Sequence, residues 1–318
     1  MWDAAHIVFD PFCINEQAIH GKVTLPNQQE IMVSFVYGLC DNRDRKHLWN
    51  DIISHASCNK KSPWTVLGDF NVTRFSHEHS NNCRVTKAME EFNGALRSAE
   101  LEDINSTGLK FTWSNMRRGT DAIFKKLDRA LGNWQWFKLF GDSYAHIYNP
   151  GISDHSPISI QLMQQLQSTG RPFKFLNFWA EHPHFLDTVR TEWEKTYDGS
   201  PLQIIKLKLK GLKSQLKKLN TRPDLETASL RQMLKNVQLG LDDKPDDVDL
   251  RNQEFRLRSE LATAARNEEA FFKQKSRILW LREGDSNTAY FHKVVTVRQS
   301  KNHIACIQNE QGAWLESQ

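Results

Sequence analysis

Cysteine is scarce in this sequence, and its few residues are widely separated. The five cysteines are odd in number, and no two of them form a C-x-x-C pair. This pattern excludes a disulfide-stapled scaffold or a zinc-finger array and is typical of reduced thiols inside a cell. His77, His79 and Cys83 lie close together, but no second pair of ligands is nearby, which favours a polar loop over a metal site. The cysteines are Cys13, Cys40, Cys58, Cys83 and Cys306.

Long hydrophobic runs are missing too. No run approaches the roughly 20 residues of a membrane-spanning helix, and the first ten residues, MWDAAHIVFD, lack a basic segment followed by an apolar one. We therefore expect neither a signal peptide nor membrane association. The 318 residues suffice for one large domain or two ordinary ones, and the mean hydropathy of −0.60 indicates that part of the chain is polar and elongated.

Charge is nearly balanced overall but differs between the two halves. The net charge is +4; residues 1–170 hold 17 basic and 18 acidic residues, whereas residues 171–318 hold 25 and 20. The basic excess of the second half permits contact with nucleic acid. A group of lysines there could follow a phosphate backbone, although the solvated face of a helix explains the same pattern. These lysines are Lys206, Lys208, Lys210, Lys213, Lys217 and Lys218.

The first half predicts alternating strands and helices. GKVTLP and EIMVSFVYG flank Asn27–Gln29 and predict a hairpin, and WTVLGDF predicts a buried strand. Apolar residues at helical spacing predict helices around Leu48–Ala56 and Met89–Ala99. KFTWSN, IFKKLDRAL and ISDHSPISIQL predict further strands. This alternation favours a layered α/β core.

The second half predicts helices instead. Near residues 168–172 the strand signals stop, and a heptad-like leucine stripe runs from Leu202 to Leu219. LGLDDKPDDVDL predicts a turn, a second helix is expected from Leu250 toward Trp280, and a small strand hairpin is expected around Gly312. We therefore divide the chain into a first domain over 1–165, a linker over 166–200 and a helical region over 201–318.

Four motifs carry possible chemistry, and each has an ordinary alternative. Asp69 and Asn71 would share one face of an extended strand, but Gly, Asp and Asn also form turns. His155 follows a carboxylate, Asp154, which suits a metal and phosphate site or a capped turn. Asp128 lies within an apolar strand and needs a partner, either a histidine or the neighbouring Lys126 or Arg129. Tyr37 suits packing on a sheet face.

The order of these motifs resembles a known family. Tyr37, GDFN at 68–71, FTWSN at 111–115, LDR at 127–129 and SDH at 153–155 follow the order and rough spacing of the endonuclease/exonuclease/phosphatase superfamily. They are most similar to the endonuclease domain of plant LINE-type (non-LTR) retrotransposons. WLREGDSNTAYFHKVVTVRQSKNHIACIQNEQGAW resembles the segment that joins that domain to reverse transcriptase, so the resemblance covers nearly the whole chain.

The resemblance implies a fold and a reaction. The fold class is α+β, an incomplete four-layered α/β sandwich followed by an α-helical hairpin region. The reaction is Mg²⁺-assisted hydrolysis of DNA phosphodiester bonds, with a nuclear site of action. The implied roles are water activation by Asp69, phosphate binding by Asn71, His155 and Tyr37, orientation of His155 by Asp128, metal contact by Asp154 and support by Thr112.

Two family motifs have no counterpart here, namely an early W-N-x-R-G-like strand and a Q-E-T-like strand with the metal-binding glutamate. Glu16 and Glu30 match by residue type alone, and no Y-x-D-D motif of a reverse transcriptase follows. We interpret the chain as an N-terminally truncated, internal fragment of a decayed reading frame with weakened Mg²⁺ affinity and impaired activity. The alternatives are an inactive nucleic-acid-binding remnant, or a helical module that self-associates through the Leu202–Leu219 stripe.

Overall fold

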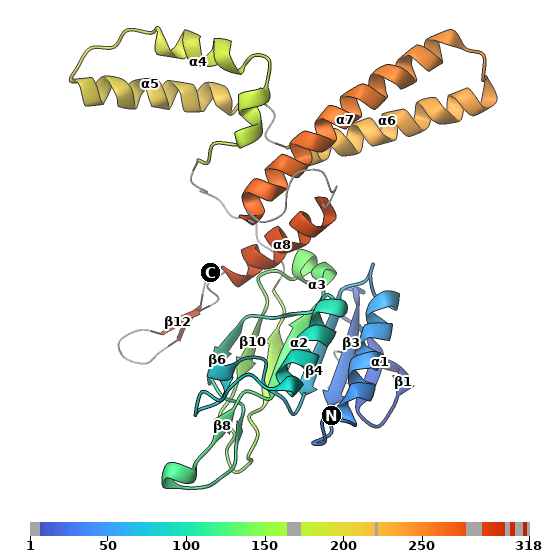
Figure 1. The fold of residues 1–318 in the computed structure, drawn as a ribbon, viewed down its shortest axis with the longest axis vertical. Helices are drawn as coiled ribbons and strands as arrows, with labels where there is room; N and C mark the ends of the chain where they lie inside the picture. The colour runs from blue at the N-terminus through green and yellow to red at the C-terminus, as the bar shows by residue number, and fades with distance from the viewer. Residues whose placement is uncertain are drawn as a thin grey trace. The chain divides into compact units, whose positions relative to one another are not determined.

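The chain forms two compact units. A computed structural model describes residues 7–163, 173–219, 222–277, 288–302, 306–308 and 314–316 (Figure 1). The first unit contains residues 1–167 and 296–318, and the second contains residues 168–295. The division falls within one helix, α8 (Thr288–Lys301). Among the described residues, no helix combines the length and the apolar character needed to cross a bilayer.

A six-stranded sheet organises the first unit. Its strand order is β1-β2-β3-β4-β9-β5, in which β3 and β4 are parallel and the other neighbours are antiparallel. Side chains alternate between the two faces along each strand, as in β3, where Ile31 and Val33 point to one core and Val36 to another. The strands are β1 (Val8–Ile14), β2 (Ala18–Thr24), β3 (Glu30–Tyr37), β4 (Trp64–Asp69), β5 (Glu102–Asp103) and β9 (Asp128–Gly132).

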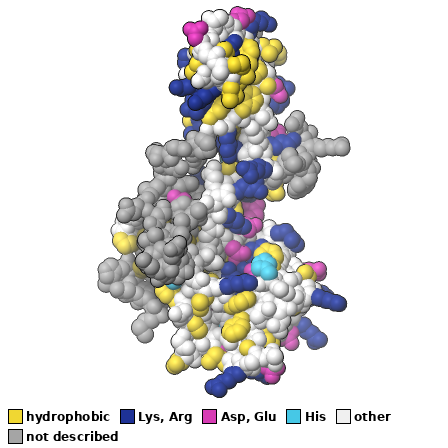
Figure 2. Space-filling view, turned by 90° about the vertical axis from the view of Figure 1, so that its left-hand side faces the viewer, with side chains coloured by type: hydrophobic (Ala, Val, Ile, Leu, Met, Phe, Trp, Pro, Cys, Tyr) yellow, Lys and Arg dark blue, Asp and Glu magenta, His cyan; other side chains and the backbone are white. Residues whose placement is uncertain are grey.

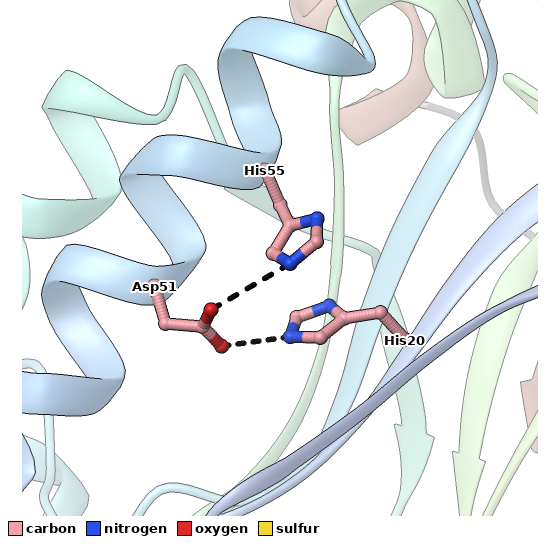
Figure 3. Close-up of side chains that lie close together, drawn as sticks. All are labelled: His20, Asp51 and His55. Carbon is pink, nitrogen blue, oxygen red and sulfur yellow. Dashed lines mark hydrogen bonds and ion pairs between the residues drawn. The ribbon is translucent and has the colours of Figure 1, made fainter. Parts of the chain in front are cut away.

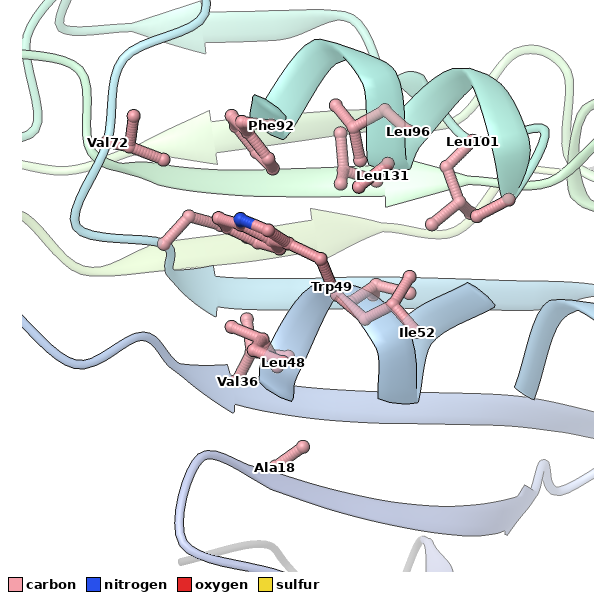
Figure 4. Packing of buried hydrophobic residues seen from close by; sticks show 14 of the residues in the cluster. Ala18, Val36, Leu48, Trp49, Ile52, Val72, Phe92, Leu96, Leu101 and Leu131 are labelled. Carbon is pink, nitrogen blue, oxygen red and sulfur yellow. The ribbon is translucent and has the colours of Figure 1, made fainter. Parts of the chain in front are cut away.

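Two helices, α1 (Arg45–Cys58) and α2 (Lys87–Ser98), cover one face of this sheet. Figure 4 shows their apolar side chains directed at the strands, with Trp49 stacked on Phe92 at a ring distance of 4.8 Å. The hydroxyl of Thr86 caps α2 by accepting from the backbone N–H of Met89. Each fully buried Leu or Phe contributes about 2 kcal/mol through loss of water contact, so this core holds the helices on the sheet.

The other face of the sheet packs against a second, three-stranded sheet of order β11-β10-β6 and against α3 (Trp134–Leu139). Trp136 and Phe137 of α3 fill this second core together with Val33 and Ala145. The first unit is therefore a mixed α+β structure with helices on one side and a second sheet on the other. The remaining strands are β6 (Ser106–Gly108), β7 (Trp113–Ser114), β8 (Phe124–Lys125), β10 (Tyr144–Ile147), β11 (Ile158–Gln161), β12 (Cys306–Gln308) and β13 (Trp314–Glu316).

The second unit is helical. Two long helices, α6 (Pro223–Asp243) and α7 (Val248–Ser276), form a hairpin whose turn ends at Asp247, which caps α7. Two shorter helices, α4 (Phe185–Trp193) and α5 (Pro201–Leu216), form a second pair (Figure 1). An aromatic core gathers Phe178, Trp179, Phe271, Phe272 and Phe291, which belong to different segments of this unit.

The helical region differs from the sequence-based prediction in its pairing. The turn after residue 243 is confirmed, but the helix that precedes it is α6, which the leucine pattern did not reveal; the heptad-like helix α5 pairs with α4. The predicted linker over 166–200 contains α4 and the core residues Phe178 and Trp179. Residues 296–318 group with the first unit rather than with the helices. Strands β12 and β13 form the predicted hairpin, and Gly312 between them lies outside the described residues.

Candidate functional site

Three strand ends meet at one edge of the six-stranded sheet. The register of β3 with β4 places Tyr37 beside Asp69, and the register of β4 with β9 places Asp69 beside Asp128. Paired residues on neighbouring strands project their side chains to the same face, here the face opposite α1 and α2. The sheet therefore aligns a tyrosine and two carboxylates across three strands.

A glycine directly before Asp69 permits this close alignment. Gly68 has φ +140°, and a Cβ atom there would lie 2.0 Å from the carbonyl oxygen of Val36 on β3. No other residue would fit without separating the two strands, so Gly68 fixes how closely β4 approaches β3 beside the site.

The chain turns directly after Asp69, so the expectation that Asp69 and Asn71 share one face of an extended strand is wrong. Strand β4 ends at Asp69, Phe70 enters the helix-side core, and Asn71 has a left-handed φ of +51°. Oδ1 of Asp69 accepts from the backbone N–H of Asn71 at 2.8 Å, an Asx turn. The Asn71 side chain donates from Nδ2 to the carbonyl oxygen of Gly38 at 2.8 Å. The turn interpretation of this motif is thus the correct local one, and it still leaves Asp69 on the edge.

His155 completes a group with the two aspartates. Its Nδ1 lies 3.0 Å from Oδ2 of Asp128, and its Nε2 lies 3.9 Å from Oδ2 of Asp69. One ligand atom from each of the three side chains lies within 4.8 Å of the others. We call Asp69, Asp128 and His155 the edge cluster. The histidine interpretation of Asp128 agrees with this geometry, whereas Arg129 pairs elsewhere.

Burial and charge act in opposite directions within the edge cluster. Burial raises the pKa of Asp69, and the nearby charge of Asp128 adds to this, while the Asn71 N–H and His155 partly offset it. Burial lowers the pKa of His155, but the hydrogen bond to Asp128 and the surrounding carboxylates outweigh it, so the His155 pKa is raised. The cluster therefore favours a protonated His155 imidazole. The Asp69 carboxyl group beside it loses its proton at a higher pH than an ordinary aspartate.

Thr112 holds the start of β9 in place through its hydroxyl group. It is 1% exposed, and its hydroxyl oxygen accepts from the backbone N–H groups of Leu127 and Asp128, both at 2.9 Å. Its own carbonyl oxygen accepts from the N–H of Ser156, directly after His155. One threonine thus connects the segments that carry Asp128 and His155, which agrees with the supporting position predicted for it.

Asp154 and Tyr37 lie outside this tight group. The carboxylate of Asp154 accepts from the indole N–H of Trp113 at 3.2 Å, and the side chain is exposed. Its charge still contributes to the raised pKa of His155. Tyr37 is 59% exposed at the end of β3. Their roles at a metal ion and at a phosphate stay predictions.

Arg45 is a buried residue of this region that sequence reasoning missed. Its Nη1 donates to the carbonyl oxygens of Leu39, Cys40 and Asn71 at 2.8–3.1 Å, so one guanidinium holds the loops after β3 and β4 together. Burial lowers the pKa of Arg45, and its charge lowers that of Asp69. Leu39 and Cys40 are close to Arg45 in sequence, but Asn71 is 26 residues away, and the sequence contains no signal that brings its carbonyl to this guanidinium.

A buried ion network lies under β9 next to the site. Arg129 is 1% exposed, and its guanidinium pairs with Glu78 and, at 3.0 Å, with Asp103, which also binds Arg74 at 2.6 Å. Burial opposes ionisation of Asp103, but the charges of Arg129 and Arg74 outweigh it and lower the pKa of Asp103. This network connects β9 to the loop after β4 and to β5. Because Arg129 binds Glu78 and Asp103, it does not pair with Asp128, which binds His155 instead.

The edge cluster has donors that suit a hard cation. Oδ2 of Asp69 is buried and has no hydrogen-bond partner among the described residues, and the Asp128 carboxylate lies beside it. Mg²⁺ prefers oxygen ligands and retains several waters, so two carboxylates are a sparse but compatible set. The loop group of His77, His79 and Cys83 gives no comparable arrangement among the described residues. There His77 stacks on Phe75, and His79 accepts from the N–H of Asn81.

The predicted lysines and leucines lie on α5 and just beyond its end. Lys206, Lys210, Lys213 and Lys217 are exposed, and the Lys213 ammonium lies 5.5 Å from the ring of Phe173. The stripe is divided: the Leu216 end is buried in the aromatic core, whereas Leu202, Ile205 and Leu209 are 78%, 46% and 51% exposed. Figure 2 shows exposed hydrophobic side chains gathered on the surface of the helical unit.

Comparison of the sequence with models of known protein families and with characterised proteins gives no match.

Proposed function

We propose that the first unit is a domain of the endonuclease/exonuclease/phosphatase superfamily, similar to the endonuclease of a plant LINE-type retrotransposon. Its family reaction is Mg²⁺-dependent hydrolysis of DNA phosphodiester bonds. One observation carries the proposal: three sequence motifs, each ordinary by itself, supply Asp69, Asp128 and His155 to one cluster. The helices α1 and α2, the six-stranded sheet and the second sheet support the finer proposal of an incomplete four-layered sandwich.

The side chains of the cluster suit the steps of such a hydrolysis. Asp69, whose buried Oδ2 has no hydrogen-bond partner among the described residues, would position and activate the attacking water. His155, held protonated by Asp128, would place a cationic N–H toward the phosphate oxygens, where negative charge develops. Asn71 and Tyr37 border the same edge and would bind the phosphate.

Asp69 and Asp128 would hold the Mg²⁺ ion, and Asp154 is the further candidate at 3.2 Å from the Trp113 indole nitrogen. A bound Mg²⁺ ion polarises phosphoryl oxygens and lowers the pKa of a coordinated water. Among the described residues the cluster has no glutamate, so we propose weak Mg²⁺ binding and slow hydrolysis. Loss of one ligand or donor typically costs about 100-fold or more.

The test is nicking of supercoiled plasmid by the full chain in Mg²⁺. His155→Ala and Asp154→Ala are compared with His47→Ala, which changes an exposed histidine on α1. We expect slow nicking by the chain and by His47→Ala, and about 100-fold less by His155→Ala. Equal nicking by all variants would contradict the proposed site. Equal silence would contradict a working enzyme and favour the second candidate function.

That second candidate is an inactive nucleic-acid-binding or helical interaction remnant. The exposed part of the stripe, from Leu202 to Leu209, and the neighbouring exposed Lys206 and Lys210 favour it. Salt-dependent DNA binding that weakens in Lys206→Gln/Lys210→Gln would support nucleic-acid contact. Concentration-dependent sedimentation that disappears in Leu202→Gln/Leu209→Gln would support self-association instead. If neither DNA binding nor sedimentation changes in these variants, both forms of the second candidate are excluded.

A further inference from the structure

A second group of metal-ligating side chains lies on the opposite face of the six-stranded sheet. Asp51 and His55 are one helical turn apart on α1, so they project from the same side of that helix. His20 lies on β2, on the face that α1 covers, since its strand neighbour Ala18 packs in the same helix-side core. Figure 3 shows the three side chains converging between helix and strand. We call His20, Asp51 and His55 the helix-side cluster.

The distances within this cluster suit three ligands of one ion. Oδ2 of Asp51 lies 2.7 Å from Nε2 of His20, and Oδ1 lies 3.6 Å from Nε2 of His55. One ligand atom from each of the three lies within 4.8 Å of the others. Ligands on a tetrahedral ion with bonds of about 2.1 Å are about 3.4 Å apart, so small side-chain adjustments bring all three into range. Both imidazoles offer Nε2, the atom farther from the backbone.

A buried serine orients His20. Nδ1 of His20 lies 2.7 Å from Oγ of Ser34, and the same oxygen accepts from the indole N–H of Trp64 at 2.8 Å. Ser34 and Trp64 are 1% exposed, and so is His20. Without metal, Nε2–H of His20 can donate to Asp51 while Nδ1 accepts from the Ser34 hydroxyl. With an ion on Nε2, Nδ1–H would donate to the same serine oxygen instead. A histidine that ligates a metal typically has such a partner for its other nitrogen.

Access and chemistry are also suitable. The side chains of Asp51 and His55 are 22% and 17% exposed, so an ion can reach the cluster from the surface although His20 is buried. The Asn15 amide donates to Oδ2 of Asp51 at 3.0 Å and steadies the carboxylate. Two imidazoles and one carboxylate suit Zn²⁺ or Co²⁺, whereas Mg²⁺ prefers oxygen ligands.

We propose that His20, Asp51 and His55 bind one divalent transition-metal ion of the zinc class and thereby connect β2 to α1. Three protein ligands leave the fourth position to water. The rings of His20 and His55 are stacked at 3.7 Å between centroids, and binding would exchange this stack for coordination. The site is separate from the edge cluster and does not depend on the proposed nuclease activity.

The test is titration of the metal-free full chain with Co²⁺. Tetrahedral nitrogen and oxygen coordination gives visible absorption bands, and displacement by Zn²⁺ gives the Zn²⁺ affinity. We expect one ion per chain and no displacement by millimolar Mg²⁺. His55→Gln and Asp51→Asn should weaken binding by at least about 10-fold, while His155→Gln of the edge cluster should leave it unchanged. Excess Zn²⁺ at about 100 times the Kd should raise the Tm by several degrees in the wild-type chain and in His155→Gln, and by less in His55→Gln and Asp51→Asn.

Circular dichroism of each metal-free variant shows whether it is folded. Asp51→Asn keeps the shape of the Asp51 side chain, so it still tests the site if His55→Gln does not fold. Unchanged affinity in both folded variants would overturn the proposal. Loss of binding in His155→Gln alone would place the ion at the edge cluster. An intense near-ultraviolet thiolate band would place it on cysteine, which would also overturn the assignment.

Discussion

The edge cluster and the helix-side cluster lie on opposite faces of one sheet. Both contain only histidine and aspartate, but in opposite ratios. In the edge cluster a single histidine lies between two aspartates, and in the helix-side cluster a single aspartate lies between two histidines. Burial lowers the pKa of both His155 and His55. The aspartates around His155 outweigh the effect of burial and raise the pKa of His155. The neighbouring His20 instead lowers the pKa of His55 further.

This difference shows how the number of carboxylates sets the chemistry of a cluster. The edge cluster favours the cationic form of the His155 imidazole and offers oxygen donors, which suit phosphate and hard cations. The helix-side cluster favours a neutral His55, and neutral imidazole is the form that binds transition metals.

Removing the ion network beside the edge cluster should have the largest effect. Arg129→Met leaves Glu78 buried without its partner and Asp103 with Arg74 alone, so we expect a loss of about 3–5 kcal/mol in the free energy of unfolding. Urea denaturation measures this loss, and Arg118→Met, at an exposed site, should change stability by less than about 0.5 kcal/mol. A loss in Arg129→Met as small as in the control would show that the network contributes little.

Thr112→Val should loosen the edge cluster selectively. Valine has nearly the same shape but leaves the N–H groups of Leu127 and Asp128 without an acceptor, at a cost of about 1–3 kcal/mol. Thr120→Val, on an exposed turn, is the matched control. Co²⁺ binding at the helix-side cluster should be unchanged in both variants. An unchanged stability of Thr112→Val would mean that water replaces the hydroxyl.

Asp69→Asn should stabilise the chain in metal-free buffer. A carboxyl group with a raised folded pKa costs stability as the pH rises from its unfolded value through the folded one, and this cost is complete at neutral pH. The amide keeps the acceptor for the Asn71 N–H, so we expect a gain of about 1 kcal/mol at pH 7. The gain should vanish near pH 3. Lower stability at pH 7 would show that attraction to His155 outweighs the cost of burial.

The two histidines should give opposite pH dependences, the smallest of these effects. The raised pKa of His155 adds stability below its unfolded pKa of about 6.5, and this stability is lost as the pH rises through the folded pKa. The lowered pKa of His55 costs stability at low pH, and this cost disappears as the pH rises through 6.5. Relative to His155→Gln, wild-type stability should therefore fall with pH, and relative to His55→Gln it should rise. Denaturation at pH 5–8 without metal measures both, and slopes of the same sign would contradict the contrast.

Much of the first unit followed from local pattern. Apolar spacing located α1, α2 and the β2–β3 hairpin, because each element buries one face and its sequence records that face. The cost of burying a lone carboxylate predicted a partner for Asp128 but left a histidine and the neighbouring Lys126 or Arg129 as alternatives, and the structure pairs Asp128 with His155. The residues of GDFN allowed a turn at Asn71 as one of two interpretations, but the choice of the turn over an extended strand depends on Asx bonding and on the nearby carbonyl of Gly38.

Other features depend on contacts between distant segments. The Asp51 and His55 spacing was visible on a helix, but only the register of β2 brings His20 opposite them. The leucines of α5 suggested a short helical hairpin that begins with this helix, yet much of that stripe remains exposed and the long hairpin belongs to α6 and α7. An apolar stripe indicates a helix and one face of it, but it does not name the partner.

Arg45 has a consequence for the motions of the edge. Because its guanidinium binds carbonyls from the loops after β3 and after β4, those loops cannot open independently. Their amides should exchange with deuterium as one cooperative unit, with a shared opening free energy. Gly38 and Asn71, one in each loop and joined by a hydrogen bond, would then open and close together, whereas Tyr37 at the end of β3 stays exposed.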